Sequence, residues 1–455
     1  MTPAARLSAA IEVIADIEAH RRPASDALKD WGLAHRFAGS GDRAAIAGLV
    51  FDTLRRRASS AHLMGEQSPR VLVLGMLRLE RGLGGKAIAA LANGARFAPA
   101  PLSGEEQSRL DAADLQDAPA WVAGDYPQWL DAHFARTFGE DRAAEGAALA
   151  ARAPLDLRVN TLKADREATL IALSHLDPVP TRWSPFGLRI MRGAEAKSPA
   201  IHAEPTFIKG MVEVQDEGSQ LAALLVAAKP GEQVIDLCAG AGGKTLALAA
   251  MMNNRGQIYA TDLDKRRLAP IHSRLERAGV HNVQVRTPKG GQSLLADLDN
   301  RADLVLIDAP CTGIGTWRRN PDAKWRMRPG ALELRMREQA DLLDRAATLV
   351  KPGGRIAYVT CSLLTEENDD QVRAFLARQP QFLPIAPSQV VDALGERAFV
   401  FQRAVRLSPE GLLMTPRQTD TDGFYVSLLG KAGMHKHPEK TNLDPACGPP
   451  HINRR

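Results

Sequence analysis

The sequence predicts an α/β fold with a mainly parallel sheet, preceded by an all-helical region and a small α/β unit. Four apolar, β-rich runs at residues 233–237, 257–262, 304–308 and 355–360 alternate with helical stretches. Strands that are apolar along their whole length are typical of parallel sheets that helices cover on both faces. Residues 1–140 are instead rich in Ala and Leu with helical periodicity, which indicates an all-helical region.

The length of the chain favours several domains. Its 455 residues exceed the about 250 to 300 that a single hydrophobic core usually organises. We expect a helical domain over residues 1–140, the small α/β unit over 150–212 and the parallel-sheet domain over 213–430. Residues 431–455 combine Pro, His, Lys and Asn with almost no apolar content, which predicts a disordered tail.

The composition is that of a folded protein outside the membrane. Hydrophobic residues make up 45% and charged residues 24%, close to the globular average, and no apolar run reaches the roughly 20 residues of a membrane helix. The 58 basic and 53 acidic residues leave a net charge of +5, which favours a polyanionic partner without requiring one. Residues 1–11 lack the apolar core of a secretory signal, so we expect a cytoplasmic protein. We also expect it to be a monomer.

The cysteines predict neither a disulfide framework nor a metal site. Cys238, Cys311, Cys361 and Cys447 show no C-x-x-C pairing and no histidine at ligand spacing. We interpret Cys238 as a packing residue in a glycine loop and Cys447 as a bystander in the tail. Cys311 and Cys361 need another interpretation, because each directly follows a predicted strand.

A glycine-rich loop from Asp236 to Thr245 follows the first of these strands and opens a helical pattern. Such a loop lets a ligand approach the backbone at a helix N-terminus. A dinucleotide would need G-x-G-x-x-G, but Thr245 holds the third glycine position. A nucleoside triphosphate is a closer alternative, because G-x-x-x-x-G-K-T fails only at Cys238 and residues 304–308 imitate a Walker-B strand.

Acidic residues at the strand ends favour a third ligand, S-adenosylmethionine. Asp236 precedes the loop and Asp262 closes the next strand. The ribose hydroxyls of an adenosyl group donate hydrogen bonds to a carboxylate, whereas phosphates repel one. Asp262 could instead cap the following helix. The expected cofactor-binding residues are Asp236, Cys238, Ala239, Gly240, Ala241, Gly242, Gly243, Lys244, Asp262 and Asp308.

Two thiols at strand ends suit methylation of carbon 5 of a cytosine. Cys311 follows Asp308 at the end of one strand, and Cys361 follows another. In open α/β sheets the ligand crevice lies beyond the carboxyl ends of the strands. C5 of cytosine becomes nucleophilic only after something adds to C6, which a thiolate does covalently, and a second group must then assist release. Asp308 would hold the N3/N4 edge of the base, and Lys244 would steer the base or a phosphate.

These motifs together resemble the RNA cytosine-C5 methyltransferase family, also called the Sun family, whose bacterial prototype is a 16S ribosomal RNA methyltransferase. The resemblance covers about residues 155–429. It rests on motifs at residues 158–161, 215–220, 236–244, 308–311, 320–322, 351–354, 360–362 and 421–425. The helical N-terminus, with Asp42 and Arg43, more loosely resembles a NusB-type RNA-binding domain.

The resemblance implies a Rossmann-like, S-adenosylmethionine-dependent methyltransferase domain that acts on RNA, most often ribosomal RNA, with transfer RNA as another candidate. It assigns the covalent attack to Cys361 and the release to Cys311. The chain departs from the family at two places. Gly240 and Ala241 replace the usual Ala-Pro, and Arg286-Thr287-Pro288 stands where the family has an Asp near the adenine. The adenine contact would then pass to a backbone group or to another acid.

Basic residues predict where RNA binds. Residues 317–337 contain seven basic and two acidic side chains, with Trp317 and Trp325 between them, which suits phosphates and stacked bases. A solvated basic loop whose tryptophans pack into the core is an equal alternative for this segment alone. The target base has to be unstacked, because the thiol reaches C6 from one face of the ring. The expected RNA-binding residues are Arg158, Asn160, Arg318, Arg319, Lys324 and Arg326.

Two rival functions stay open at this point. The missing adenine-side acid is compatible with a non-catalytic RNA-binding or ribosome-assembly protein that keeps the fold. The run from Gly242 to Thr245 is compatible with a P-loop nucleotide hydrolase.

Overall fold

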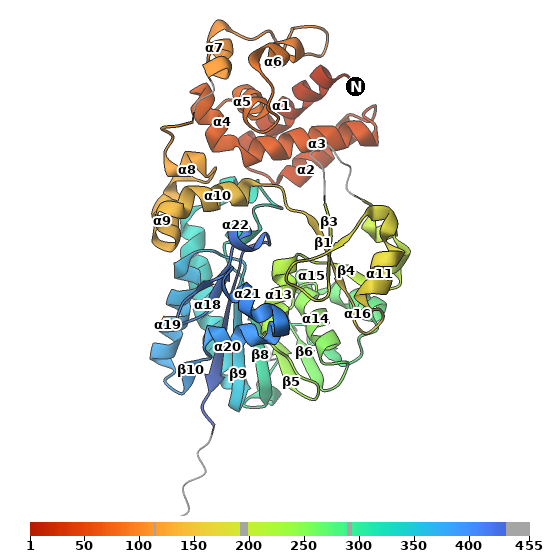
Figure 1. Ribbon diagram of the computed structural model, residues 1–455, viewed down its shortest axis with the longest axis vertical. Helices are drawn as coiled ribbons and strands as arrows, with labels where there is room; N and C mark the ends of the chain where they lie inside the picture. Colours follow the sequence, from red (N-terminus) through yellow and green to blue (C-terminus); the bar gives the residue numbers. More distant parts are fainter. Residues whose placement is uncertain (113–114, 192–198, 289–293, 434–455) are drawn as a thin grey trace, which may run out of the picture.

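The computed structural model describes residues 1–112, 115–191, 199–288 and 294–433, and the molecule is elongated, with the helical region at one end (Figure 1). Lys431 ends the last strand, and residues 434–455, which include most of the expected disordered tail and Cys447, lie outside the described residues. Among the described residues no helix combines the length and the apolar character that crossing a bilayer demands.

The N-terminal region is helical, as predicted. Its central helix α5 (Pro69–Leu79) is buried at every position from Val71 to Leu77, because the other helices surround it. On α1 the buried residues recur every three or four positions, which gives one apolar face. The other helices are α1 (Pro3–His20), α2 (Ala24–Ala34), α3 (Ser40–Arg55), α4 (Arg57–Met64), α6 (Gly85–Leu91), α7 (Gly104–Ala112), α8 (Ala120–Ala123), α9 (Asp131–Phe138) and α10 (Arg142–Ala150).

A small antiparallel sheet follows, with strand order β2-β3-β1-β4. Its strands are β1 (Leu155–Val159), β2 (Val179–Pro180), β3 (Gly187–Ile190) and β4 (Val212–Val214), and α11 (Arg166–Ala172) packs on them. The guanidinium of Arg189 is held by the carboxylate of Asp156 within this sheet. Figure 1 shows this unit beside the larger sheet, below the helical region.

The large sheet confirms the predicted fold class. Its order is β11-β12-β13-β9-β8-β5-β6-β7, and the five strands from β9 to β7 are parallel. The antiparallel strand β13 pairs with β9 on the other side. The strands are β5 (Gln233–Asp236), β6 (Gln257–Ala260), β7 (Val283–Val285), β8 (Ala302–Asp308), β9 (Val350–Thr360), β10 (Phe382–Pro384), β11 (Arg406–Leu407), β12 (Leu412–Met414) and β13 (Phe424–Lys431).

Helices cover both faces of this sheet, which explains why its strands are apolar throughout. On one face α13 (Glu217–Leu225) and α14 (Gly243–Met251) pack on Val234 and Leu304. On the other face α18 (Pro329–Leu349) and α19 (Asp369–Arg378) pack on Ile235 and Val305. The remaining helices are α12 (Pro205–Ile208), α15 (Lys265–Leu268), α16 (Ile271–Ala278), α17 (Ala323–Arg326), α20 (Pro387–Val391), α21 (Ala398–Gln402) and α22 (Pro416–Thr419).

Candidate active site

The carboxyl ends of three adjacent parallel strands bring the predicted chemistry together. Asp236 ends β5, Asp308 ends β8, and Cys361 follows β9 directly. Since β8 pairs with both β5 and β9, these residues share one edge of the sheet. The sulfur of Cys311 lies 3.3 Å from the sulfur of Cys361. The structure therefore places both predicted thiols side by side.

The sulfur of Cys311 is enclosed beside Cys361. A hydrogen bond with Cys361 and burial raise the pKa of Cys311 well above its ordinary value. Cys311 therefore ionises less readily than a free thiol, and its sulfur is hydrogen-bonded with that of Cys361. The amide of Gly315 donates to the carbonyl of Cys361 at 2.9 Å, which fixes the backbone of that residue.

Lys244 and Asp308 form an ion pair beside the thiols. The ammonium of Lys244 lies 2.8 Å from Oδ2 of Asp308 and 4.8 Å from the centre of the Phe424 ring. The lysine side chain is buried, whereas the carboxylate is 33% exposed. Asp308 can therefore accept a hydrogen bond from a ligand while Lys244 holds its other side.

The glycine loop is shaped by close contacts. Gly242 has a φ of +85°, and a Cβ there would lie 2.6 Å from the side chain of Ile271, so only glycine fits. One oxygen of Asp262 accepts from the amide of Gly240 at 3.0 Å, and the other accepts from the amide of Asp264 at 2.9 Å. Asp264, not Asp262, caps α15. Asp262 thus ties the loop to the following turn, and its contact with a ribose stays a prediction.

Asp236 offers a test of whether the loop fits S-adenosylmethionine. Its carboxylate is 1% exposed, and Oδ2 accepts from the hydroxyl of Thr245 at 2.7 Å. Oδ1 is buried without a hydrogen-bond partner, and burial raises the pKa of this group to about 7. A buried acceptor without a donor is costly unless a ligand supplies one. An amino or hydroxyl group of the cofactor would do so, and the residues fit this cofactor.

The same contacts disfavour a nucleoside triphosphate. In a P-loop the lysine contacts the phosphates and the threonine hydroxyl binds Mg²⁺. Here Lys244 is paired with Asp308, and Thr245 donates to Asp236. Three carboxylates around the loop would also repel phosphate.

The region after β7 leaves the adenine contact open. The guanidinium of Arg286 pairs with the carboxylate of Asp297 and lies 4.6 Å from the centre of the Tyr259 ring. Residues 289–293, which follow the substituted motif, lie outside the described residues. The transfer of this contact to a backbone group or another acid stays a prediction.

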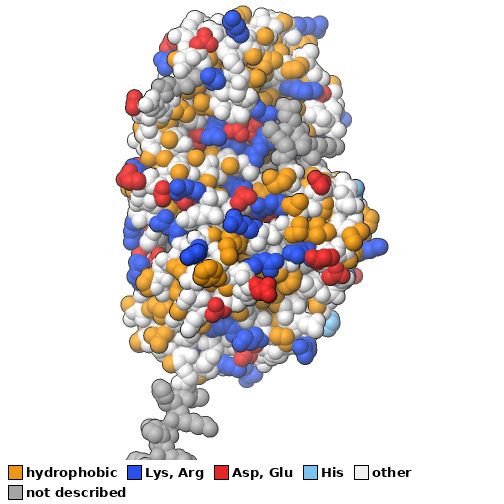
Figure 2. All heavy atoms as spheres, viewed as in Figure 1, with side chains coloured by type: hydrophobic (Ala, Val, Ile, Leu, Met, Phe, Trp, Pro, Cys, Tyr) orange, Lys and Arg blue, Asp and Glu red, His pale blue; other side chains and the backbone are white. Residues whose placement is uncertain are grey.

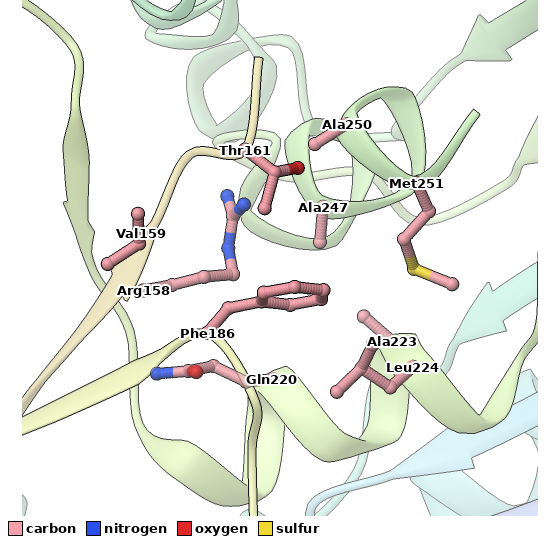
Figure 3. Close-up of a pocket in the computed structure, with 10 residues that line it drawn as sticks. All are labelled: Arg158, Val159, Thr161, Phe186, Gln220, Ala223, Leu224, Ala247, Ala250 and Met251. Atoms are coloured by element: carbon pink, nitrogen blue, oxygen red, sulfur yellow. The ribbon is translucent and has the colours of Figure 1, made fainter. Parts of the chain in front are cut away.

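Two of the expected RNA contacts need correction. The side chain of Arg158 is buried, and its Nε donates to Oε1 of Gln215 at 2.6 Å. Figure 3 shows the Arg158 side chain beside the ring of Phe186. The cavity that these residues line has a volume of about 10 Å³, which is too small for a nucleotide. The amide of Asn160 is also buried and donates to the carbonyls of Gly210 and Ala278. Both side chains brace the small sheet against the large domain and are too buried to serve as RNA contacts.

Arg318 and Lys324 need the same correction. Arg318 is buried between the 420–421 turn and the carbonyl of Arg152. Lys324 is 1% exposed, and its ammonium donates to the carbonyls of Arg55 and Asp125. Burial lowers the pKa of Lys324 to about 7. Hence α17 packs between the helical region and the large domain.

Other residues of the segment 317–337 fit either the RNA-binding interpretation or the interpretation as a solvated loop with buried tryptophans. Trp317 is buried in the core, as the alternative interpretation expected. Arg319 is half-buried between Asp216 and Asp422, whereas Arg326 is more exposed and pairs with Asp322. Their RNA contacts stay predictions. On the face in Figure 2, basic side chains alternate with acidic ones and form no single basic surface.

Sequence reasoning missed the residues that hold the thiol loops. Thr312, Gln339, Ser362, Glu367 and Asn368 are hydrogen-bonded around the two cysteines. No local signal in the sequence could have found Glu367, because the acidic run that begins two residues after Leu364 is typical of a solvated turn.

Comparison with known proteins agrees with this geometry. Residues 223–430 match the family described as 16S rRNA methyltransferase RsmB/F, and residues 126–196 match a ferredoxin-like domain of RsmF/B-like methyltransferases. The chain is 32% identical to a probable ribosomal RNA small subunit methyltransferase B from Synechocystis over 68% of this chain and 67% of that protein. It is 35% identical to ribosomal RNA small subunit methyltransferase F from Cronobacter sakazakii over 60% of this chain and 56% of that protein.

Solved structures extend the likeness to the fold. The crystal structure of PH0851 covers 95% of this chain and 99% of its own, with 26% identity and a TM-score of 0.68. A methyltransferase homolog protein from Pyrococcus horikoshii covers 69% of this chain and 97% of its own, with 27% identity and a TM-score of 0.54. With the thiols, the glycine loop and these matches in agreement, the chain belongs to the RsmB/F family of S-adenosylmethionine-dependent 16S rRNA methyltransferases.

Proposed function

We propose that this protein methylates C5 of a cytosine in ribosomal RNA, with Cys361 as the nucleophile and Cys311 as the group that assists release. The observation that carries the proposal is the 3.3 Å separation of the two sulfurs, beside the Lys244–Asp308 ion pair and the glycine loop. A pair of thiols at a ligand crevice has a chemical use in this reaction, which a buried structural pair does not have.

Each side chain has a role in the sequence of bonds. The thiolate of Cys361 adds to C6, which makes C5 nucleophilic, while Asp308 accepts a hydrogen bond from the N3/N4 edge of the ring. S-adenosylmethionine, when bound at the glycine loop, supplies an electrophilic methyl group. Water then takes the C5 proton, the electrons of the C5–H bond form the C5=C6 double bond, and the bond between C6 and the sulfur of Cys361 breaks to return the thiolate. The proton on Cys311 can hydrogen-bond the departing sulfur, because the two sulfurs are in contact.

The two cysteines predict opposite phenotypes. The Cys361→Ala variant should lose methylation of 16S rRNA completely, because no group adds to C6. The Cys311→Ala variant should accumulate a denaturation-resistant protein–RNA adduct, because release is slowed. Transfer of a labelled methyl group and gel mobility under denaturing conditions measure the two effects, with Cys447→Ala as the control. Methylation by Cys361→Ala at the wild-type rate would overturn the proposal.

The target site can be identified directly. Bisulfite sequencing of ribosomal and transfer RNA from a strain without this protein should show one or more cytosines that have lost methylation. An unchanged pattern in ribosomal RNA, with a loss in transfer RNA, would move the proposal to the other substrate class.

A further inference from the structure

Two adjacent residues contact both loops that carry the thiols. Glu367 ends the short helix Thr365–Glu367, and Asn368 precedes α19. Their exposures are 0% and 2%, respectively. Each of the two residues is hydrogen-bonded, directly or through a neighbour, to the residues just before and just after one cysteine.

Glu367 holds the loop of Cys311. Its Oε1 accepts from the amide of Thr312 at 2.8 Å and from Nε2 of Gln339 at 3.0 Å, and its Oε2 accepts from the hydroxyl of Thr312. The same Nε2 of Gln339 donates to the carbonyl of Pro310 at 3.0 Å. The residues before and after Cys311 are therefore fixed to one buried carboxylate, directly or through Gln339.

Asn368 holds the loop of Cys361 in the same way. Its Oδ1 accepts from the hydroxyl of Thr360 at 2.6 Å, and its Nδ2 donates to the carbonyl of Ser362 at 3.0 Å. The hydroxyls of Ser362 and Thr312 lie 3.2 Å apart and join the two loops. The two thiols thus sit on a single hydrogen-bonded support.

This support matters because a strand end does not by itself determine where the next side chain lies. A displacement of about 1 Å costs as much as 10²-fold in rate when reacting groups must be aligned. Buried acceptors bonded to loop amides and hydroxyls resist such a displacement, since an unpaired buried group is costly.

We infer that Glu367 and Asn368 are positioning residues that set the distance between the two sulfurs, Glu367 through the Cys311 loop and Asn368 through the Cys361 loop. The inference deepens the proposed function and rests on it for the kinetic consequences, but the geometry can be tested without RNA. Asn368 then supports the attack by Cys361, and Glu367 supports the release that Cys311 assists.

The first experiment measures the sulfur–sulfur geometry alone. The azodicarboxamide oxidant diamide joins two nearby thiols: each thiol loses a proton and an electron, an S–S bond forms, and the N=N bond is reduced to a hydrazine. The Cys311–Cys361 disulfide should form about tenfold more slowly in Glu367→Gln and in Asn368→Asp than in the wild-type protein, because the loops lose alignment. Rates equal to or faster than the wild-type rate in both variants overturn the inference.

Glu366→Gln is the matched control, since Glu366 pairs with His133 and Arg136 on the other side of the short helix. It should form the disulfide at the wild-type rate. Thr312→Val provides a second test if Glu367→Gln does not fold, because it removes only the hydroxyl that joins Glu367 and Ser362. It should also slow disulfide formation, and a wild-type rate in this variant would count against the inference.

The second experiment uses 16S rRNA. In single-turnover reactions Asn368→Asp should slow formation of the covalent adduct, whereas Glu367→Gln should form it at the wild-type rate and accumulate it. Equal loss of both steps in both variants would overturn the division of roles. If neither the wild-type protein nor Cys311→Ala forms an adduct, the proposed function fails, while the diamide rates still decide whether these residues set the geometry.

Discussion

The thiol edge of the sheet and the basic segment 317–337 were both predicted to be functional, but the structure exposes the two regions to different degrees. Cys311 and Cys361 meet at the carboxyl ends of β8 and β9. Arg318 and Lys324 are buried in contacts with other parts of the chain. The difference teaches that the place of a residue at a strand end follows from the sheet, whereas the exposure of a charged side chain depends on what packs over it.

Among the residues around the thiols, the largest effect should come from the Lys244–Asp308 ion pair. Asp308→Asn removes the charge that holds Lys244 and weakens the acceptor for the base, so methyl transfer should fall by about 10²-fold to 10³-fold. RNA affinity should not change. Filter binding and labelled methyl transfer measure the two quantities, and Lys229→Met, at an exposed position, is the control. A wild-type rate in Asp308→Asn would remove this carboxylate from the mechanism.

The next effect concerns the stability of the contact between the domains. Lys324→Met leaves the carbonyls of Arg55 and Asp125 without a donor, so the free energy of unfolding should fall by about 1 to 3 kcal/mol. Denaturant unfolding measures the change. Unaltered stability together with weaker RNA binding would contradict the structure and restore Lys324 as an RNA contact.

The pH dependence of stability sharpens this test. The pKa of Lys324 is about 7 in the folded protein and 10.5 when the side chain is exposed in the unfolded chain. Between these two pH values the unfolded chain therefore binds more protons than the folded protein. The free energy of unfolding should therefore rise with pH across this window relative to Lys324→Met. Parallel unfolding curves at pH 7, 8.5 and 10 for the two proteins, with a constant gap, would show that the ammonium is not buried.

The smallest effect should come from an exposed residue of the same segment. Arg328 is exposed, and Arg328→Met should leave stability unchanged and weaken RNA binding by a few-fold. If its guanidinium contacts a phosphate, the salt dependence of binding should lose a slope of about 1. An unchanged salt dependence would show that RNA does not cross this part of the segment.

Much of the candidate site could be predicted from sequence. Local signals identify the glycines before a helix, the acids Asp236 and Asp308 at the ends of β5 and β8, and the cysteines after two strands. These signals are clear because the strands that precede them are apolar. Glu367 and Asn368 could not be found this way. The partners of Glu367 lie after β8 and on α18, and those of Asn368 lie at the end of β9, so no local pattern distinguishes these two residues from a solvated acidic turn.

The sequence by itself determined the fold class, the glycine loop and the two cysteines at strand ends, because periodicity and turn residues are local properties of the chain. Only the tertiary structure decided that the two sulfurs are in contact, that Glu367 and Asn368 support them, and that Arg158, Asn160, Arg318 and Lys324 face inward. The physical reason is that burial and hydrogen-bond partners depend on residues far away in the sequence, which meet only when the domains pack together.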